Sequence, residues 1–237
     1  MRKTYRGFIL DADNTLFDFD RGEREALADT LSRLLGPENC PPEAFESYHR
    51  INATLWRGFE RGAVPLEELR VGRFRELFAQ LGLKADPRQA SELYIEALSG
   101  KAFLLPHARE VLESLHRRAA LALLSNGLSR VQRGRLAGSG IAELFQRIII
   151  SEEVSLVKPD PGIFLLALSE LGLPGPEVLC VGDSPITDIR GAHLAGLATC
   201  WLQSPGSLYP PEEPPPDYRI SDLRELLDFA PDRDSPR

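Results

Sequence analysis

The stretch YRGFILDADNTLFDFD, residues 5–20, joins a short apolar run to four acidic residues, and this junction decides how the fold is read. The run Tyr5–Leu10 has the length and the aromatic and branched side chains of a β-strand. Carboxylates directly after a strand lie at its carboxyl end, which is where open parallel sheets bind ligands. We therefore expect Asp11 and Asp13 to belong to a functional site.

Beyond this stretch the sequence divides into a helical block and an alternating block. From Arg21 to Gly100 apolar residues recur at spacings of three and four, which predicts helices throughout and no strand. After Leu105-Pro106 short apolar runs alternate with helical patterns. The further predicted strands are residues 119–124, 147–150, 178–183 and 197–202. Such alternation predicts a mostly parallel sheet covered by helices on both faces.

The expected fold class is α/β, a Rossmann-like, doubly wound sheet with an inserted α-helical cap domain. The helical block separates the first strand from all the others, so it reads as an insertion. We expect a core domain of residues 1–17 and 101–237 and a cap domain of residues 18–100. Asp18 and Asp20 are expected in a solvent-facing loop that leads into the cap.

Composition and charge exclude several classes of partner. The 237 residues carry a net charge of −7 with a pI near 5.3, which gives no bulk attraction for nucleic acid or an anionic membrane. The N-terminus lacks a secretory apolar region, and the longest apolar run, Ala119–Leu124, is far too short to span a membrane. The four histidines show no paired spacing typical of zinc ligands. We expect a cytoplasmic protein, a monomer or homodimer, with a small-molecule substrate.

Polar side chains gather at the predicted strand ends. Five come directly after strands and two follow shortly behind: Asp11, Asp13, Ser125, Asn126 and Asp183, and Lys158 and Asp188. Carboxylates brought together at about 4 Å repel by about 4 kcal/mol per pair at an effective dielectric constant near 20. A divalent cation removes this conflict, and a donor set of oxygens without His or Cys favours Mg²⁺ shared with phosphate oxygens. A lysine beside a hydroxyl and backbone amides suits the remaining phosphoryl oxygens.

The order of these residues resembles a known family. Four stretches are similar to the four motifs of the haloacid dehalogenase (HAD) superfamily of phosphohydrolases: Asp11-x-Asp13-x-Thr15-Leu16, Ser125-Asn126-Gly127, Lys158-Pro159 and Gly182-Asp183-x4-Asp188. The similarity runs from about Phe8 to Leu202. The segments DADNTLFDFD, NATLWRGFERG, ISEEVSLVKPDPGIF and GLATCWL resemble the pyrimidine 5′-nucleotidase branch, which hydrolyses nucleoside monophosphates.

The resemblance implies a catalytic role for each aspartate of the first motif. Asp11 would attack phosphorus and form an aspartyl-phosphate, and Asp13 would protonate the leaving alkoxide and then activate the hydrolytic water. The main-chain carbonyl of Asp13 and the carboxylates of Asp11 and Asp183 would bind Mg²⁺. The implied activity is that of a Mg²⁺-dependent phosphomonoesterase acting on nucleoside 5′-monophosphates.

The remaining motif residues are implied to hold the phosphoryl group. Ser125 and the amide of Asn126 would bind its oxygens. Lys158 would neutralise charge on the nucleophile and on the phosphoryl group. Asp188 would orient Lys158 or reach the metal through water.

Four residues of the helical block stand where the nucleotidase branch has similar residues: Asn52, Trp56, Arg73 and Phe74. Helical spacing favours a core position for Trp56 and Phe74. Asn52 and Arg73 are the predicted substrate contacts.

Other functions stay open, although no feature demands the retained phosphorylated intermediate of a phosphomutase. A phosphatase acting on phosphoglycolate or a sugar phosphate would share the core motifs and differ only in its cap. A haloacid dehalogenase would attack carbon with the same nucleophile and need no metal, but the second carboxylate, Asp13, is typically absent from dehalogenases. A non-catalytic module that kept the fold is disfavoured, because every motif residue is present.

Overall fold

The computed structural model describes residues 3–232, and this part of the chain forms two compact units. One unit, the cap, is Asp20–Ala102, and the other, the core, combines the described residues up to Phe19 with those from Phe103 onward. Each junction lies two residues beyond the predicted boundary. The first two and last five residues of the predicted core domain lie outside the described part.

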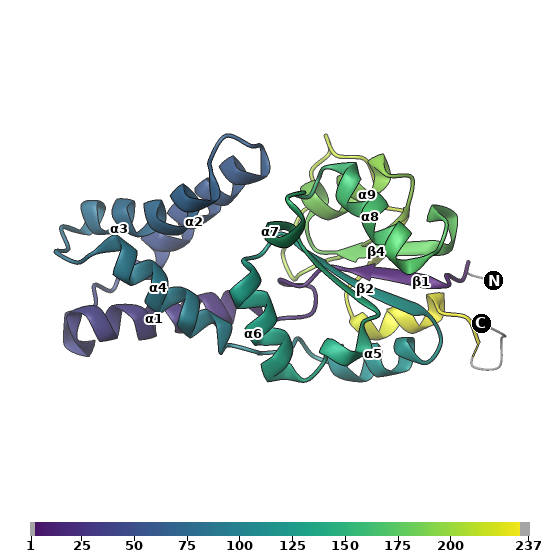
Figure 1. The fold of residues 1–237 in the computed structure, drawn as a ribbon, viewed down its shortest axis with the longest axis horizontal. Helices are drawn as coiled ribbons and strands as arrows, with labels where there is room; N and C mark the ends of the chain where they lie inside the picture. The colour runs from purple at the N-terminus through teal and green to yellow at the C-terminus, as the bar shows by residue number, and fades with distance from the viewer. Residues whose placement is uncertain (1–2, 233–237) are drawn as a thin grey trace. The chain divides into compact units, whose positions relative to one another are not determined.

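The core is built on one six-stranded sheet in which every neighbouring pair of strands is parallel (Figure 1). Its strands are β1 (Gly7–Leu10), β2 (Ala120–Ser125), β3 (Arg147–Ile150), β4 (Val178–Gly182), β5 (Ala198–Leu202) and β6 (Tyr218–Ile220), in the spatial order β3-β2-β1-β4-β5-β6. The strand order reverses at β1, which lies between β2 and β4. The predicted α/β fold class is confirmed, and the carboxyl end of β1 is the position where such sheets bind ligands.

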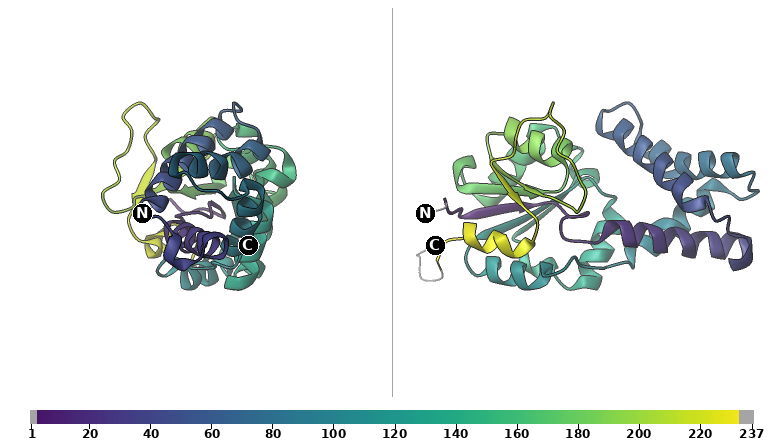
Figure 2. Two further views of the ribbon diagram at one scale, coloured as in Figure 1. Left: turned by 90° about the vertical axis from the view of Figure 1, so that its left-hand side faces the viewer. Right: turned by 180° about the vertical axis from the view of Figure 1, so that it is seen from behind.

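Helices cover both faces of this sheet, as Figure 2 shows. The helices of the core are α5 (Ala108–His116), α6 (Ser129–Ser139), α7 (Ser151–Val154), α8 (Pro161–Leu171), α9 (Gly191–Leu194), the π-helical turn η5 (Pro185–Arg190) and the 3₁₀ helices η3 (Ala142–Leu144), η4 (Gly175–Glu177) and η6 (Leu223–Phe229). α5 and η6 pack on one face, and α8 and α9 pack on the other. The short helix α7, directly after β3, is not among the predicted elements.

The helical segment that follows β4 consists of two elements, η5 and α9. Pro185 opens η5, and the side chain of Ser184 caps it by accepting a hydrogen bond from the amide of Thr187 at 3.1 Å. The amide of Ile189 bonds to the carbonyl of Ser184, five residues back, at 3.2 Å. This widened turn carries Asp188, in keeping with the frequent use of π-helical turns at functional sites.

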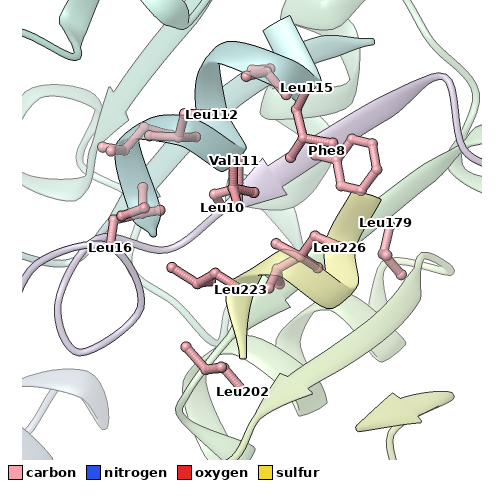
Figure 3. Packing of buried hydrophobic residues seen from close by; sticks show 14 of the residues in the cluster. Phe8, Leu10, Leu16, Val111, Leu112, Leu115, Leu179, Leu202, Leu223 and Leu226 are labelled. Carbon is pink, nitrogen blue, oxygen red and sulfur yellow. The ribbon is translucent and has the colours of Figure 1, made fainter. Parts of the chain in front are cut away.

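The alternation of side chains along β1 anchors its carboxyl end. Phe8 and Leu10 face α5 and η6, whereas Ile9 faces α8, and all three are fully buried. Figure 3 shows the first cluster, in which leucines and a valine of α5 and η6 surround the strand: Val111, Leu112, Leu115, Leu223 and Leu226. Each such side chain contributes about 1.5–3 kcal/mol by burial, so the position of the residue after Leu10 is rigidly determined.

The cap is helical throughout, and all of its residues are described. Its elements are α1 (Phe19–Leu35), whose first residue belongs to the core, the 3₁₀ helix η1 (Pro37–Asn39), α2 (Ala44–Glu60), the π-helical turn η2 (Glu68–Gly72), α3 (Arg73–Leu81) and α4 (Pro87–Ser99). Its centre contains the buried rings of Tyr48, Phe74 and Tyr94, with centroids 5.3–5.5 Å apart. The loop predicted for Asp20 is wrong, because this exposed acid lies in the first turn of α1, where a negative charge suits the helix dipole.

Among residues 3–232, no helix is both long and apolar enough to cross a membrane.

Candidate active site

A tight turn after β1 sets the two aspartates of the first motif. The amide of Asp11 bonds to the carbonyl of Val181 at 2.9 Å, which continues the ladder between β1 and β4 by one residue. The carbonyl of Ala12 then accepts hydrogen bonds from the amides of Leu16 and Phe17, both at 2.9 Å. Asp11 is therefore fixed by the sheet itself and is buried, whereas Asp13 lies on the turn with 29% of its side chain exposed.

Lys158 joins two of the predicted carboxylates in the interior. Its ammonium donates to Oδ1 of Asp11 and Oδ1 of Asp188, both at 2.6 Å, and to the carbonyl of Leu124 at 3.2 Å. Three acceptors match the three protons of an ammonium. Burial opposes its charge, but Asp11 and Asp188 outweigh that effect and raise the pKa of Lys158, so it stays a cation.

The carboxamide of Asn126 holds the main chain of Lys158 on both sides. Its Nδ2 donates to the carbonyl of Lys158 at 2.9 Å, and its Oδ1 accepts from the amide of Lys158 at 2.8 Å. The strand end of β2 thus determines where the lysine enters the site. The prediction for Asn126 concerned only its amide, and a side-chain clamp between two motifs has no sequence signal.

Asp188 is oriented from the other side by the loop after β4. Its Oδ2 accepts the amide of Ser184 at 3.0 Å, while its Oδ1 accepts Lys158. A Cβ at Gly182 would lie 2.2 Å from Oδ2 of Asp188, so only glycine leaves room for this carboxylate. The main-chain carbonyl of Asp183 accepts the indole N–H of Trp201 at 2.7 Å, which fixes the peptide beside the third carboxylate.

Three carboxylates converge on one point at this sheet edge. Asp11, Asp183 and Asp188 each offer an oxygen, and these oxygens lie within 4.8 Å of one another. Burial raises the pKa of Asp11 to about 7 in spite of the opposing charge of Lys158. Burial and the charges of Asp11 and Asp188 also raise the pKa of Asp183 well above its usual range. The single positive charge of Lys158 does not neutralise three carboxylates. A cluster of oxygen ligands with excess negative charge fits a divalent cation such as Mg²⁺.

Asp13 has partners that the sequence reasoning missed. Nε2 of Gln132 donates to Oδ2 of Asp13 at 3.0 Å and to the hydroxyl of Ser125 at 2.9 Å. Arg135 donates from Nη2 to Oδ1 of Asp13 and, at 2.8 Å, to Oε1 of Gln132. Both residues are completely buried on α6. The signal available in the sequence was two long polar residues three apart, which share a helix face.

The core motif residues thus form one connected site. Asp11, Lys158, Asp188 and Asn126 are linked by hydrogen bonds, and Asp183 lies in the carboxylate cluster. Ser125 connects to Asp13 through Gln132, and its hydroxyl also accepts the amide of Gly127 at 3.0 Å. The roles assigned to these residues in catalysis and metal binding stay predictions, but their convergence has the geometry that those roles need.

The predicted substrate contacts of the cap lie in a buried network of the cap itself. Nδ2 of Asn52 donates to Oε1 of the buried Glu23 at 2.7 Å, and its Oδ1 accepts Nη1 of Arg73 at 3.1 Å. Asn52 and Arg73 are 3% and 2% exposed. Of the two residues predicted for the core of the cap, Phe74 is fully buried and Trp56 is half-buried. A role of Asn52 and Arg73 in substrate binding stays a prediction.

A buried lysine shared between carboxylates at the switch point of a parallel sheet is typical of an enzyme active site. The sequence model of the haloacid dehalogenase-like hydrolases matches residues 5–196, and this chain belongs to that family. The predicted resemblance is therefore confirmed, and the protein is a hydrolase.

Similar proteins of known structure or name cover almost the whole chain. It is 35% identical to the pyrimidine 5′-nucleotidase YjjG of Escherichia coli, over 92% of this chain and 94% of that protein. It is 34% identical to the phosphoserine phosphatase of Thermus thermophilus, over 92% of this chain and 96% of that protein. The crystal structure of the HAD-hydrolase YfnB of Bacillus subtilis, bound to magnesium, matches with a TM-score of 0.87 and 31% identity, covering 95% of this chain and 98% of that one.

Proposed function

We propose that this protein is a Mg²⁺-dependent phosphomonoesterase that forms an aspartyl-phosphate on Asp11 and hydrolyses nucleoside 5′-monophosphates. The observation that carries the proposal is the pair of aspartates on the turn after β1, one buried against Lys158 and the other held by α6. A nucleophile and a separate acid–base group two residues apart suit a reaction in two displacement steps.

In the first step Asp11 is the nucleophile. One of its oxygens attacks phosphorus while the bond from phosphorus to the leaving oxygen breaks, and the bonding electron pair departs with that oxygen. The carboxyl proton of Asp13 passes to the leaving oxygen, so the alcohol leaves and Asp13 becomes a carboxylate. Lys158 stabilises the charge that develops on the phosphoryl oxygens, and the hydroxyl of Ser125 binds one of them.

In the second step Asp13 is the base. It takes a proton from water while the water oxygen attacks phosphorus. The bond between phosphorus and Asp11 breaks, and its electron pair returns to the Asp11 carboxylate. Inorganic phosphate leaves, and Asp13 is again protonated for the next turnover.

Mg²⁺ fits the cluster of Asp11, Asp183 and Asp188, with the main-chain carbonyl of Asp13 as a further candidate ligand. When bound, the ion supplies positive charge to the phosphoryl oxygens and lets the nucleophile stay ionised. Asp188 also orients Lys158, since each of its two oxygens has its own donor. The magnesium in the crystal structure of the related YfnB supports the same choice of ion.

The metal-independent dehalogenase reaction is disfavoured by the surroundings of Asp13. Its carboxylate has two donors, Gln132 and Arg135, from one buried face of α6. A dehalogenase forms an ester on the nucleophile and expels a halide, which needs no proton. A second carboxylate held so firmly suits an alkoxide leaving group instead.

The substrate class rests on similarity and on the cap. YjjG is named a pyrimidine 5′-nucleotidase, which supports a nucleoside monophosphate. A second candidate substrate is phosphoserine, because a relative of nearly equal identity is a phosphoserine phosphatase. The core motifs cannot separate these esters. Asn52 and Arg73 are the proposed cap residues that would contact the nucleoside.

A substrate panel tests the proposal. Turnover of pyrimidine and purine 5′-monophosphates, phosphoserine, phosphoglycolate and sugar phosphates is measured by phosphate release, with and without EDTA and with Mg²⁺ restored. We expect the highest kcat/KM for a nucleoside monophosphate, loss of activity in EDTA and recovery with Mg²⁺. Preference for phosphoserine would replace the substrate while keeping the chemistry, and full activity in EDTA would overturn the metal dependence.

Two aspartate variants test the nucleophile. Asp11→Asn should abolish turnover of every ester in the panel, because the amide cannot form the phosphoenzyme. The exposed Asp20→Asn removes the same charge from the first turn of α1 and should retain activity. Turnover by Asp11→Asn above that of buffer would refute the assignment.

A further inference from the structure

We infer that Gln132 and Arg135 are positioning residues for Asp13, which fix its carboxylate for proton transfer to the leaving group and from water. The inference rests on the proposed phosphatase function. It assigns to one face of α6 a task that none of the four sequence motifs includes.

The geometry around Asp13 is specific to its two oxygens. Oδ2 accepts Nε2 of Gln132 at 3.0 Å, and Oδ1 accepts Nη2 of Arg135. The same Nη2 reaches Oε1 of Gln132 at 2.8 Å, so the two donors also hold each other. Rotation of the carboxylate would break at least one of these bonds, and Asp13 is therefore locked in one orientation.

Gln132 ties this orientation to the phosphoryl site. Its Nε2 also donates to the hydroxyl of Ser125 at 2.9 Å, and Ser125 is the proposed ligand of a phosphoryl oxygen. One amide group thus sets the distance between the acid–base carboxyl and the group that binds phosphate. A Cβ at Gly127 would lie 2.1 Å from Nε2 of Gln132, so the motif glycine leaves the room that this amide occupies.

Burying the guanidinium of Arg135 costs desolvation free energy, which must be offset by the groups that surround it. Its side chain is fully buried, and its Nε and Nη1 have no hydrogen-bond partner among the described residues. The guanidinium lies 4.8 Å from the ring centroid of Phe17 and 5.7 Å from that of Phe19. A buried ion pair is weak evidence for stability, since apolar residues of similar volume often do as well. The cation on α6 is thus better explained by the group that it holds.

The rate of the first step with different leaving groups shows whether Arg135 positions Asp13 or only supports the fold. A nitrophenolate leaves without a proton, whereas an alkoxide needs one from Asp13. Loss of Arg135 should therefore slow transfer from an alkyl phosphate much more than transfer from 4-nitrophenyl phosphate. The second step uses Asp13 as a base whatever the ester was, so it should slow for both.

The experiment compares Arg135→Met with Arg133→Met in the full-length protein with Mg²⁺. Both changes remove an arginine from α6, but Arg133 is 49% exposed and pairs with the surface residue Glu153. Methionine retains an apolar stem against the two phenylalanines. Single-turnover rates are measured by rapid quench for an alkyl ester that the wild type hydrolyses and for 4-nitrophenyl phosphate.

For Arg135→Met we expect the rate with the alkyl ester to fall about 10- to 100-fold, a part of the usual general-acid contribution. The rate with the nitrophenyl ester should fall less than about threefold, and excess nitrophenyl ester should give a burst of about one nitrophenolate per enzyme before slow turnover. Arg133→Met should change none of these values.

Equal losses for the two esters without a burst would overturn the inference and leave Arg135 a structural residue. If Arg135→Met does not fold by circular dichroism, Arg135→Lys and Gln132→Leu are measured instead, and the same ratio between esters decides. Failure of the wild type to form a phosphoenzyme on Asp11 would instead refute the proposed function, so the two failures are distinguishable.

Discussion

The buried carboxylate of Asp11, the proposed nucleophile, is expected to lower the stability of the metal-free protein, so that Asp11→Asn stabilises it. The pKa of Asp11 is raised from 3.8 to about 7, primarily by burial. A rise of about three pKa units corresponds to about 4 kcal/mol against the ionised form in the folded state. Asparagine has nearly the same shape and no charge, so it removes this penalty.

The sign of the pH dependence follows from proton binding. Between about pH 4 and pH 7 the folded state holds the Asp11 proton more tightly than the unfolded state does. The stability of the wild type should therefore fall as the pH rises through this window. The gain from Asp11→Asn should be about 2 kcal/mol at pH 5 and about 4 kcal/mol at pH 8.

The loss of the hydrogen bond to Lys158 acts in the opposite direction. Breaking a buried ion pair commonly costs about 3–5 kcal/mol, because the remaining charge has no partner. Here Lys158 keeps the carboxylate of Asp188 at 2.6 Å, so its charge stays neutralised. The raised pKa of Asp11 already includes the attraction of Lys158. The free energy gained by removing the buried charge of Asp11 should therefore exceed the free energy lost with its hydrogen bond to Lys158.

The assay is urea unfolding of wild type and Asp11→Asn in EDTA at pH 5 and pH 8. A Trp56→Phe background leaves Trp201, which lies in the core unit, as the only tryptophan and thus as the reporter of that unit. Mg²⁺ should narrow the gap at pH 8, because an ion at 100 times its Kd stabilises the intact site by about 2.7 kcal/mol. An Asp11→Asn protein that is less stable than wild type in EDTA at pH 8 would refute this reasoning.

Three further changes probe the supports of the site and the cap. Gly182→Ala places a Cβ 2.2 Å from the Asp188 carboxylate, so this carboxylate must move. The misplaced carboxylate should lower kcat at least about 100-fold. A wild-type kcat would contradict this expectation. Trp201→Phe removes the 2.7 Å bond to the carbonyl of Asp183 and should raise the Mg²⁺ concentration for half-activation about 10-fold, whereas an unchanged Mg²⁺ titration would exclude a role for the indole. Asp86→Ala removes the N-cap residue of α4, whose carboxylate accepts the amide of Arg88 at 3.0 Å. The free energy of unfolding of the cap domain should fall by about 1 kcal/mol, measured by urea unfolding with the fluorescence of Trp56. An unchanged free energy would mean that water replaces the carboxylate at the end of the helix.

The sequence predicted the architecture because strand periodicity and chain order carry that information. The run Tyr5–Leu10 contains β1, and the apolar run over residues 119–124 overlaps β2 in all but its first residue. Parallel strands place their carboxyl ends at one edge of the sheet, so the sequence alone predicts that Asp11 and Asp183 lie close together. The two short helices α7 and α9 were harder to predict from the sequence, because four residues are too few to show a helical period.

The partners of the motif residues could not be predicted, because they depend on distances between elements. Asn126 clamps the main chain of Lys158, and neither residue type indicates the other. Gln132 looks like any polar residue of an exposed helix until α6 packs that face against the turn after β1. In the cap, Asn52 and Arg73 were assigned by resemblance. The bonds of Asn52 to Arg73 and to Glu23 follow only from the packing of α1, α2 and α3.

The two aspartates of the turn after β1 differ in their cationic partners, which are Lys158 for Asp11 and Arg135 for Asp13. Asp11 has 9% of its side chain exposed and shares Lys158 with Asp188, which suits a nucleophile that must meet phosphorus without competing water. Asp13 has 29% of its side chain exposed, although Gln132 and Arg135 of α6 each bind one of its oxygens, so part of the carboxyl group is accessible to water. An acid–base group must exchange its proton in every turnover, so it needs that access, whereas a nucleophile does not. The different roles proposed for Asp11 and Asp13 would therefore depend on two buried cations on different elements, Lys158 after α7 and Arg135 on α6.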